Sequence, residues 1–329
     1  MKLSIVATLY KSEKYIRSFC ERSATAAKQL VGNDFEIMLI NDGSPDSSLK
    51  VAVELVETYP SLEIIDLSRN FGHHKAMMTG LLHAKGDYIF LIDSDLEEEP
   101  EWLISFADQM ENENCDVVYG VQEKRKGGAF ERYSGKIFYR ILRLLMHERL
   151  PENITVARLM TRQYVEALLL HQEQEIYIAG LWHATGFKQH PQIVKKHSSS
   201  KTTYTFKRKI SLMVNSVTAF SNLPLISIFY CGFFILSLSC CYAAFLIIQK
   251  FLFYRMLGWT SIMASIWFLG GLIVSYLGII GIYLSKIFNE IKRRPYTIIK
   301  HVYKKNASQI SKKKVLRTTI AEATKVIDF

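Results

Sequence analysis

Apolar and polar residues alternate in blocks along roughly the first 120 residues of the chain. Short apolar runs bounded by polar turns predict buried strands, and the longer amphipathic segments between them predict helices. The predicted strands are Leu3–Thr8, Phe35–Ile40, Leu62–Leu67 and the run before Asp93, and the predicted helices are Glu13–Leu30, Ser47–Tyr59 and His74–Ala84. Strands separated by helical patterns of about 10–15 residues predict crossover connections, and hence an α/β fold with a mostly parallel sheet.

Two long apolar stretches follow this mixed region. Leu225–Ile248 contains 24 residues without a charge, and Gly258–Ser285 contains 28. About 20 predominantly apolar residues cross a bilayer, so we expect transmembrane helices at 224–249 and 257–285. Two buried helices of a soluble core are the alternative, although that would be unusual at this length.

The positions of basic residues predict how these helices are oriented. Basic side chains flank both apolar stretches, whereas the loop between them holds only Lys250 and Arg255. The positive-inside bias therefore predicts a multi-pass protein of the cell inner (plasma) membrane with both termini in the cytoplasm. Met1 leads directly into a short strand-like run, which does not resemble a signal peptide. We expect a cytosolic catalytic domain at 1–210, with interfacial helices near 130–147 and 201–220, and a basic cytoplasmic tail at 286–329.

Composition adds information about partners. The 41 Lys and Arg residues exceed the 31 Asp and Glu residues, and much of the net charge of +10 falls in the tail. Basic segments beside a membrane are attracted to anionic headgroups by about 1 kcal/mol per residue, so we expect membrane lipids as partners. Basic and aromatic residues do not interleave in a nucleic-acid-binding module, so no nucleic acid is expected. The five cysteines form no Cys-x-x-Cys pair, which indicates structural packing.

Three carboxylates at a spacing of two residues follow the apolar run Ile89–Ile92, namely Asp93, Asp95 and Glu97. At the end of a buried strand they would repel one another unless a cation held them, and oxygen ligands suit Mg²⁺ or Mn²⁺, with substrate phosphates completing the coordination. Asp42 follows another predicted strand. Ligands of such sheets bind outside the carboxyl ends of the strands, so Asp42 and Asp93 should line one crevice. Solvated loop carboxylates are the alternative.

Seven short segments, in this order, resemble family-2 glycosyltransferases of the polyprenyl-phosphate type: Leu9–Glu13, Asn41–Asp46, Ser68–Gly72, Asp93–Glu97, Val118–Val121, Arg158–Met160 and Gly186–Gln189. That group includes dolichol-phosphate mannose synthases and bacterial enzymes that load sugars onto undecaprenyl phosphate. The resemblance extends over roughly residues 1–300. It implies a GT-A fold, a UDP- or GDP-sugar donor, a Mg²⁺ or Mn²⁺ ion, a polyprenyl phosphate acceptor and inversion at the anomeric carbon. It leaves a homo-oligomer open.

The resemblance also implies roles for individual residues. Asp93, Asp95 and Glu97 would hold the metal, with Asp93 and Asp95 also catalytic; relatives commonly carry Gln at the position of Glu97. The donor would contact six residues: Thr8, Tyr10, Glu13, Asp42, Arg69 and Ser94. No metal role is expected for His73 and His74, which follow Gly72. Glu98, Glu99 and Glu101 are expected to form a solvated acidic face at the start of a helix.

Arginines are the expected ligands of the acceptor, because a guanidinium binds a phosphate through two parallel hydrogen bonds. The candidates are Arg125, Arg132 and Arg158, the first two near an apolar helix that carries arginines. Solvated faces are the alternative for each. Relatives often have a carboxylate where this chain has Val156, so no general base is assigned there. Two other functions stay open: a glycosyltransferase that extends a lipid-linked glycan, and a non-catalytic membrane adaptor.

Overall fold

The computed structural model describes residues 2–122, 153–171, 173, 178–196, 259–292, 294–306 and 309–313, and short pieces between 225 and 245. Arg125, Arg132 and the interfacial helices expected near 130–147 and 201–220 lie outside the described residues. The chain divides into two compact units. The first comprises Met1–Tyr139, Arg149–Tyr204 and Arg294–Phe329, and the second comprises Arg140–Glu148 and Thr205–Arg293.

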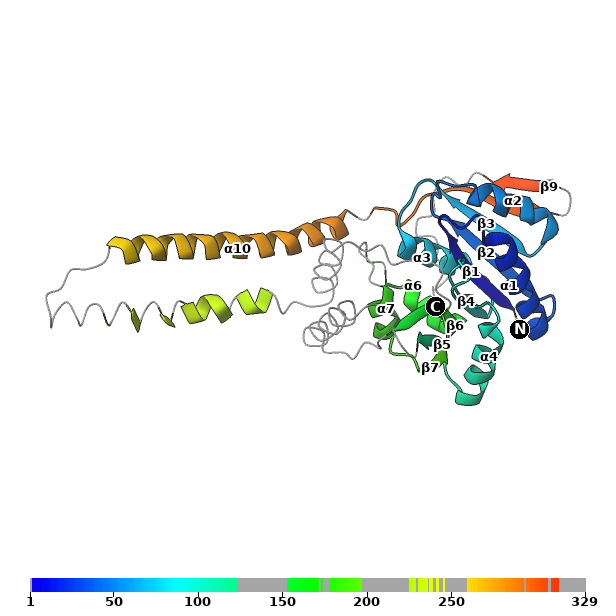
Figure 1. Ribbon diagram of the computed structural model, residues 1–329, viewed down its shortest axis with the longest axis horizontal. Coiled ribbons are helices and arrows are strands. Elements are labelled where there is room, and N and C mark those ends of the chain that lie inside the picture. The colour runs from blue at the N-terminus through cyan, green and yellow to red at the C-terminus, as the bar shows by residue number, and fades with distance from the viewer. Residues whose placement is uncertain are drawn as a thin grey trace, which may run out of the picture. The chain divides into compact units, whose positions relative to one another are not determined.

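A mixed sheet forms the centre of the first unit (Figure 1). Its order is β7-β5-β6-β4-β1-β2-β3-β8-β9. The strands are β1 (Leu3–Leu9), β2 (Phe35–Asn41), β3 (Leu62–Leu67), β4 (Tyr88–Leu91), β5 (Val117–Gln122), β6 (Ile154–Thr161), β7 (Gln189–Val194), β8 (Ile299–Asn306) and β9 (Gln309–Lys313). The four central strands, β4, β1, β2 and β3, are parallel to one another. The expected α/β architecture of the GT-A type is therefore confirmed.

Helices lie on both faces of the parallel strands. They are α1 (Ile16–Val31), α2 (Ser48–Thr58), α3 (His73–His83), α4 (Trp102–Glu113), α6 (Arg162–Leu169) and α7 (Ile178–Ala184). Alternate residues of a strand point to opposite faces. On one face Ile5 and Ile37 belong to the core that α1, α2 and α4 cover. On the other face α3 lies so close to the sheet that any side chain at Gly80 would collide with Val6 and Ile40.

The predicted elements of this region are confirmed to within a few residues. The largest shift is at α1, which begins at Ile16 because Ser12–Tyr15 form a turn, closed by the Tyr15 N–H and the Ser12 carbonyl at 2.8 Å. The strand order reverses between β1 and β4, since β2 and β3 lie on one side of β1 and β4 on the other. Such a switch point opens a crevice at the carboxyl ends of the strands.

The expected basic tail at 286–329 requires a correction, because residues 299–306 and 309–313 form strands β8 and β9 of the sheet. β8 runs antiparallel to β3 and pairs Tyr303 with Ile64. The lysines that suggested a tail point to partners on the domain: Lys304 Nζ lies 3.0 Å from Glu63 Oε2. The returning chain is fixed before β8 as well, where the Ser68 N–H donates to the Ile298 carbonyl at 2.8 Å. Pairing thus covers the otherwise open edge of β3.

The second unit contains α10 (Trp259–Ile291), a helix of 33 residues. Its segment Phe268–Ile291 has a mean hydropathy of 1.9 over its most apolar stretch. Among the residues that the structure describes, this is the one helix long and apolar enough to cross a membrane. It overlaps the span expected at 257–285. The span expected at 224–249 contains the short apolar helix Leu225–Ile235 but falls largely outside the described residues, so it stays a prediction.

Candidate functional site

Two of the expected site residues, Thr8 and Asp93, lie close together at the carboxyl ends of β1 and β4. His73, the first residue of α3, links them: its Nδ1 lies 2.9 Å from Thr8 Oγ1, and its Nε2 lies 3.3 Å from Asp93 Oδ1. Ser94 adds a second link, since its hydroxyl donates to the Thr8 carbonyl at 2.7 Å and lies 3.0 Å from Ser12 Oγ. The Ser94 side chain is buried, so its hydroxyl fixes the loop after β4 against β1.

Asp42, after β2, holds the loop that follows β3. One carboxylate oxygen accepts from the Phe71 N–H at 2.7 Å, and the other accepts from the Gly72 N–H at 3.1 Å. Burial raises the pKa of Asp42 above its ordinary value, although these two N–H groups act in the opposite direction. The loop places the Arg69 guanidinium 4.1 Å from the centre of the Phe71 ring, on an exposed surface. Asp42 therefore shapes the loop that presents Arg69.

Tyr10 and Glu13 lie where the chain leaves β1. The Tyr10 ring is 49% exposed, so it is available to a flat ligand, and Lys11 Nζ lies 5.6 Å from its centre. The Glu13 carboxylate accepts from the Ser47 N–H at 3.2 Å and is also exposed. Neither side chain is buried in the core. Their expected contacts with the nucleoside remain predictions.

The carboxylates after β4 are held in a tight turn. Asp95 Oδ1 accepts from the Glu97 N–H at 3.0 Å, and Leu96 between them has a left-handed backbone with φ 58°. Burial would raise the pKa of Asp93, but its hydrogen bond to His73 and the charge of that ring outweigh burial and lower the pKa. Burial raises the pKa of Asp95, and the neighbouring charge of Asp93 adds to the effect. This turn thus concentrates negative charge, and His73 is the basic side chain that pairs with Asp93.

Oxygen donors for a cation are present, but not a complete cage. Among the described residues, no three His, Cys, Asp or Glu side chains lie close enough together to bind a metal by themselves. Mg²⁺ is commonly held by one or two carboxylates, with water and substrate phosphates supplying the remaining ligands. Asp93 and Asp95 suit that arrangement, with Glu97 in the same turn.

Glu98 does not lie on the expected solvated face, because the structure buries it completely. Its two oxygens accept from the backbone N–H groups of Val156, at 3.1 Å, and Ala157, at 2.8 Å. Lys196, which follows β7, lies 3.4 Å from it. Burial, followed by the charge of Asp93, raises the pKa of Glu98 to about 7. A carboxylate therefore lies beside the β6 segment around Val156 after all, supplied by another part of the chain.

Arg158 is placed away from solvent. Its guanidinium carbon lies 2.9 Å from the centre of the Trp182 ring, its Nε donates to the Val156 carbonyl at 3.3 Å, and the residue is 1% exposed. Burial lowers the pKa of Arg158 to about 10. In this conformation Arg158 packs between β6 and α7, and its expected contact with the acceptor phosphate stays a prediction.

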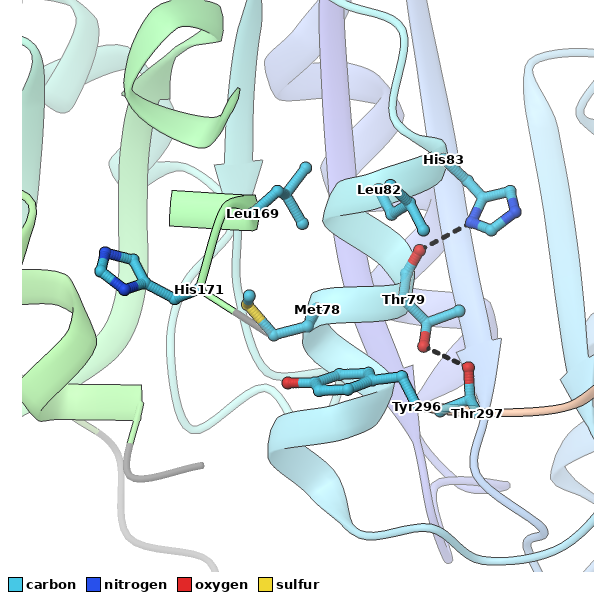
Figure 2. Close-up of a pocket in the computed structure, with 8 residues that line it drawn as sticks. All are labelled: Met78, Thr79, Leu82, His83, Leu169, His171, Tyr296 and Thr297. Carbon is cyan, nitrogen blue, oxygen red and sulfur yellow. Dashed lines mark hydrogen bonds between the residues drawn. The ribbon is translucent and has the colours of Figure 1, made fainter. Parts of the chain in front are cut away.

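A small pocket lies farther along α3 (Figure 2). It is lined by Met78, Thr79, Leu82, His83, Leu169, His171, Tyr296 and Thr297. Figure 2 shows the Thr79 and Thr297 hydroxyls pointing toward each other, 2.8 Å apart. This contact fixes the chain that returns from α10 onto α3. None of the carboxylates after β4 lines the pocket, so we assign it no role in donor binding.

Three residues of the site were missed by sequence reasoning, namely His73, Glu98 and Lys196. The sequence around His73 indicates no role for it, because its partners Thr8 and Asp93 are distant in sequence. Glu98 looked like part of a solvated acidic run. Lys196 belongs to no motif, and only the pairing of β7 with β5 brings it toward the crevice.

Comparisons with known proteins identify the family of this chain. Residues 4–169 match Glycosyl transferase family 2. A protein of Mycobacterium tuberculosis (strain CDC 1551 / Oshkosh) named as a glycosyltransferase is 50% identical over 305 residues, which are 92% of this chain and 89% of that protein. The bactoprenol glucosyl transferase of Shigella phage SfII is 29% identical over 312 residues, 93% of this chain and 100% of that protein.

Among solved structures, glucosyl-3-phosphoglycerate synthase of Mycobacterium tuberculosis, in complex with Mn²⁺, uridine diphosphate and phosphoglyceric acid, aligns with a TM-score of 0.46 at 16% identity. The alignment covers 66% of this chain and 76% of that chain. The sequence matches establish the class of protein: it is a glycosyltransferase. The chain belongs to glycosyl transferase family 2.

Proposed function

We propose that this glycosyltransferase transfers one sugar from a UDP- or GDP-sugar to a polyprenyl phosphate, such as undecaprenyl phosphate, at the cytoplasmic face of the membrane. The observation that carries the proposal is the group of carboxylates after β4, at the switch point of the sheet, in a chain that aligns with a bactoprenol glucosyl transferase over that protein's whole length. The nucleoside binds near Tyr10, Glu13 and the loop held by Asp42, and the diphosphate lies toward Asp93 and Asp95. Thr8 and Ser94 hold these segments in place.

A divalent cation, Mg²⁺ or Mn²⁺, would be held by Asp93, Asp95 and Glu97 and would neutralise negative charge on the departing diphosphate. The chain's own contribution is to keep these carboxylates ionised and in place. His73 lowers the pKa of Asp93 and holds that carboxylate in place, and the Glu97 N–H in the turn at Leu96 holds Asp95 in place.

The acceptor phosphate is its own nucleophile. Its second pKa is near 6, so it is largely dianionic at neutral pH and needs no general base. A phosphate oxygen attacks the anomeric carbon from the side opposite the leaving group, and the bond from that carbon to the donor diphosphate breaks. The electron pair departs with the nucleoside diphosphate, and the sugar is inverted. Arg125 and Arg132 are the proposed ligands of the acceptor phosphate, with Arg158 supporting β6 or reaching the phosphate after a rearrangement.

The membrane arrangement completes the proposal. α10 crosses the bilayer together with a second helix at 224–249, and both termini lie in the cytoplasm. Cysteine labelling in intact cells then reaches a cysteine placed between residues 249 and 257 but neither terminus. Labelling of a terminus without permeabilisation would refute this topology.

One experiment tests the transfer itself. Purified full-length protein is incubated with a panel of nucleotide sugars and undecaprenyl phosphate, and the lipid products are identified by mass. The expected product is the lipid phosphate plus one sugar, formed by the wild type and not by Asp95→Ala, which should fold normally because Asp95 is not part of the core. If only a lipid-linked glycan with a free sugar hydroxyl is used, the rival function of glycan extension replaces this one.

A further inference from the structure

One ammonium group lies among the carboxylates of the crevice. Lys196 Nζ is 3.4 Å from Glu97 Oε2 and 3.4 Å from Glu98 Oε1, and its side chain is 22% exposed. Asp93 and Asp95 are close enough to add to its stabilisation: together the four carboxylates raise the pKa of Lys196, against the effect of its burial. Lys196 therefore supplies a positive charge to this acidic turn.

This ammonium and a metal ion held by Asp93, Asp95 and Glu97 would compete for the Glu97 carboxylate. Four carboxylates carry a formal charge of −4, and Lys196 and a protonated His73 together supply at most +2. A lysine is a compact point charge on a flexible stem, so it can leave one anionic partner for another without rearranging the backbone. Glu98 keeps its two backbone N–H donors if the lysine leaves, which limits the cost of that movement.

We infer that Lys196 exchanges partners during the reaction: it neutralises Glu97 and Glu98 in the donor-free site and binds the donor's diphosphate when a divalent cation takes its place. The inference rests on the proposed function. Its consequence is that metal and nucleoside diphosphate bind in a coupled manner, because the diphosphate offers the displaced ammonium a new partner. Lys196 would then also stabilise the charge that develops on the leaving group.

The test measures binding of two probes to the full-length protein in detergent. The first probe is Mn²⁺ alone, followed by its electron paramagnetic resonance signal. The second is UDP or GDP, whichever the wild type binds, titrated calorimetrically at saturating Mn²⁺. The variant is Lys196→Gln, and the matched control is Lys195→Gln, since the neighbouring Lys195 side chain is exposed.

Opposite changes are expected for the two probes. Lys196→Gln should bind Mn²⁺ alone about thirtyfold more tightly, because a unit positive charge about 4 Å from the divalent ion is removed. It should bind the nucleoside diphosphate about ten- to a hundredfold more weakly, because a charge-assisted contact is lost. Lys195→Gln should change neither value.

Each other result has a distinct meaning. Weaker binding of both probes would indicate a structural role for Lys196 and overturn the inference, as would two unchanged affinities. Tighter Mn²⁺ binding with unchanged diphosphate binding would leave Lys196 as a counter-ion only, and the proposed exchange would be wrong. If the wild type binds neither UDP nor GDP with Mn²⁺, the proposed function itself fails.

Discussion

Removing the Glu98 carboxylate should destabilise the domain substantially. In Glu98→Ala the backbone N–H groups of Val156 and Ala157 lose their acceptors, and Lys196 keeps only Glu97. A buried N–H left without an acceptor costs about 1–3 kcal/mol; the Ala157 N–H is buried and the Val156 N–H is partly buried, so the two together cost at most about 2–6 kcal/mol. Because burial of this carboxylate is itself unfavourable, as its raised pKa indicates, we expect a net loss in the lower half of that range, about 3 kcal/mol.

Thermal unfolding of the full-length protein measures this loss. A domain of about 150–250 residues loses about 2–4 °C in Tm for each kcal/mol, so Glu98→Ala should lower Tm by about 6–12 °C. Hydrogen exchange gives a local readout: the amides of Val156 and Ala157 should be protected in the wild type and exchange much faster in the variant. Glu98→Gln retains one acceptor oxygen, and its effect should lie between those of the wild type and Glu98→Ala.

The matched control is Glu111→Ala, which removes the same side chain from an exposed position near the end of α4. Its Tm should stay within about 2 °C of the wild type, since exposed substitutions usually change stability by less than about 0.5 kcal/mol. If Glu98→Ala has no larger effect than this control, or if the two amides stay protected, then Glu98 does not hold β6 and the reasoning is wrong.

Four further predictions concern the site and the core. Gly43→Ala should lower Tm by about 4–10 °C and weaken nucleoside diphosphate binding, because φ is +60° and the new Cβ would lie 2.5 Å from a backbone nitrogen of the loop after β3. The control is Gly32→Ala, where φ is +64° and no neighbouring atom lies within 4 Å. That substitution should cost only the backbone strain of about 1–2 kcal/mol. Burial raises the pKa of Cys20 to about 12, so its thiol should resist iodoacetamide at pH 8 until the protein unfolds, as peptide mass mapping would show. EDTA should abolish transfer and added Mn²⁺ or Mg²⁺ should restore it, whereas full activity in EDTA would contradict the metal assignment. Arg125→Ala and Arg132→Ala should raise KM for polyprenyl phosphate about ten- to a hundredfold with little change for the nucleotide sugar, and Lys at either position should rescue only in part.

The central fold could be predicted from the sequence because its strands are continuous apolar runs. β1 and β2 are buried along their whole length, which is the pattern expected for parallel strands covered on both faces. β8 could not be found in the same way. Its alternation of apolar and basic residues resembles a solvated tail, and only the open edge of β3, about 240 residues earlier in the chain, makes it a strand.

In the candidate site, too, features set by neighbouring residues could be predicted, whereas contacts between residues distant in sequence could not. Asp42, Asp93 and Asp95 follow buried strands directly, so their position at one edge of the sheet could be predicted. The partners of Glu98 could not, since they lie 58, 59 and 98 residues away. A run of glutamates is ordinarily solvated, and nothing within that run indicates that one member is buried.

The environment of Glu98 also bears on the choice of acceptor. The chain lacks a carboxylate at Val156, and the nearby Glu98 could be regarded as its replacement and hence as a general base. Both of its oxygens, however, already accept backbone hydrogen bonds, and one also pairs with Lys196. To accept a proton from a sugar hydroxyl, Glu98 would have to weaken contacts that hold β6. A phosphate acceptor is already ionised at neutral pH and therefore requires no such proton transfer. The carboxylates of this crevice are therefore better suited to holding charge in place than to moving protons, and that is the requirement of transfer to a lipid phosphate.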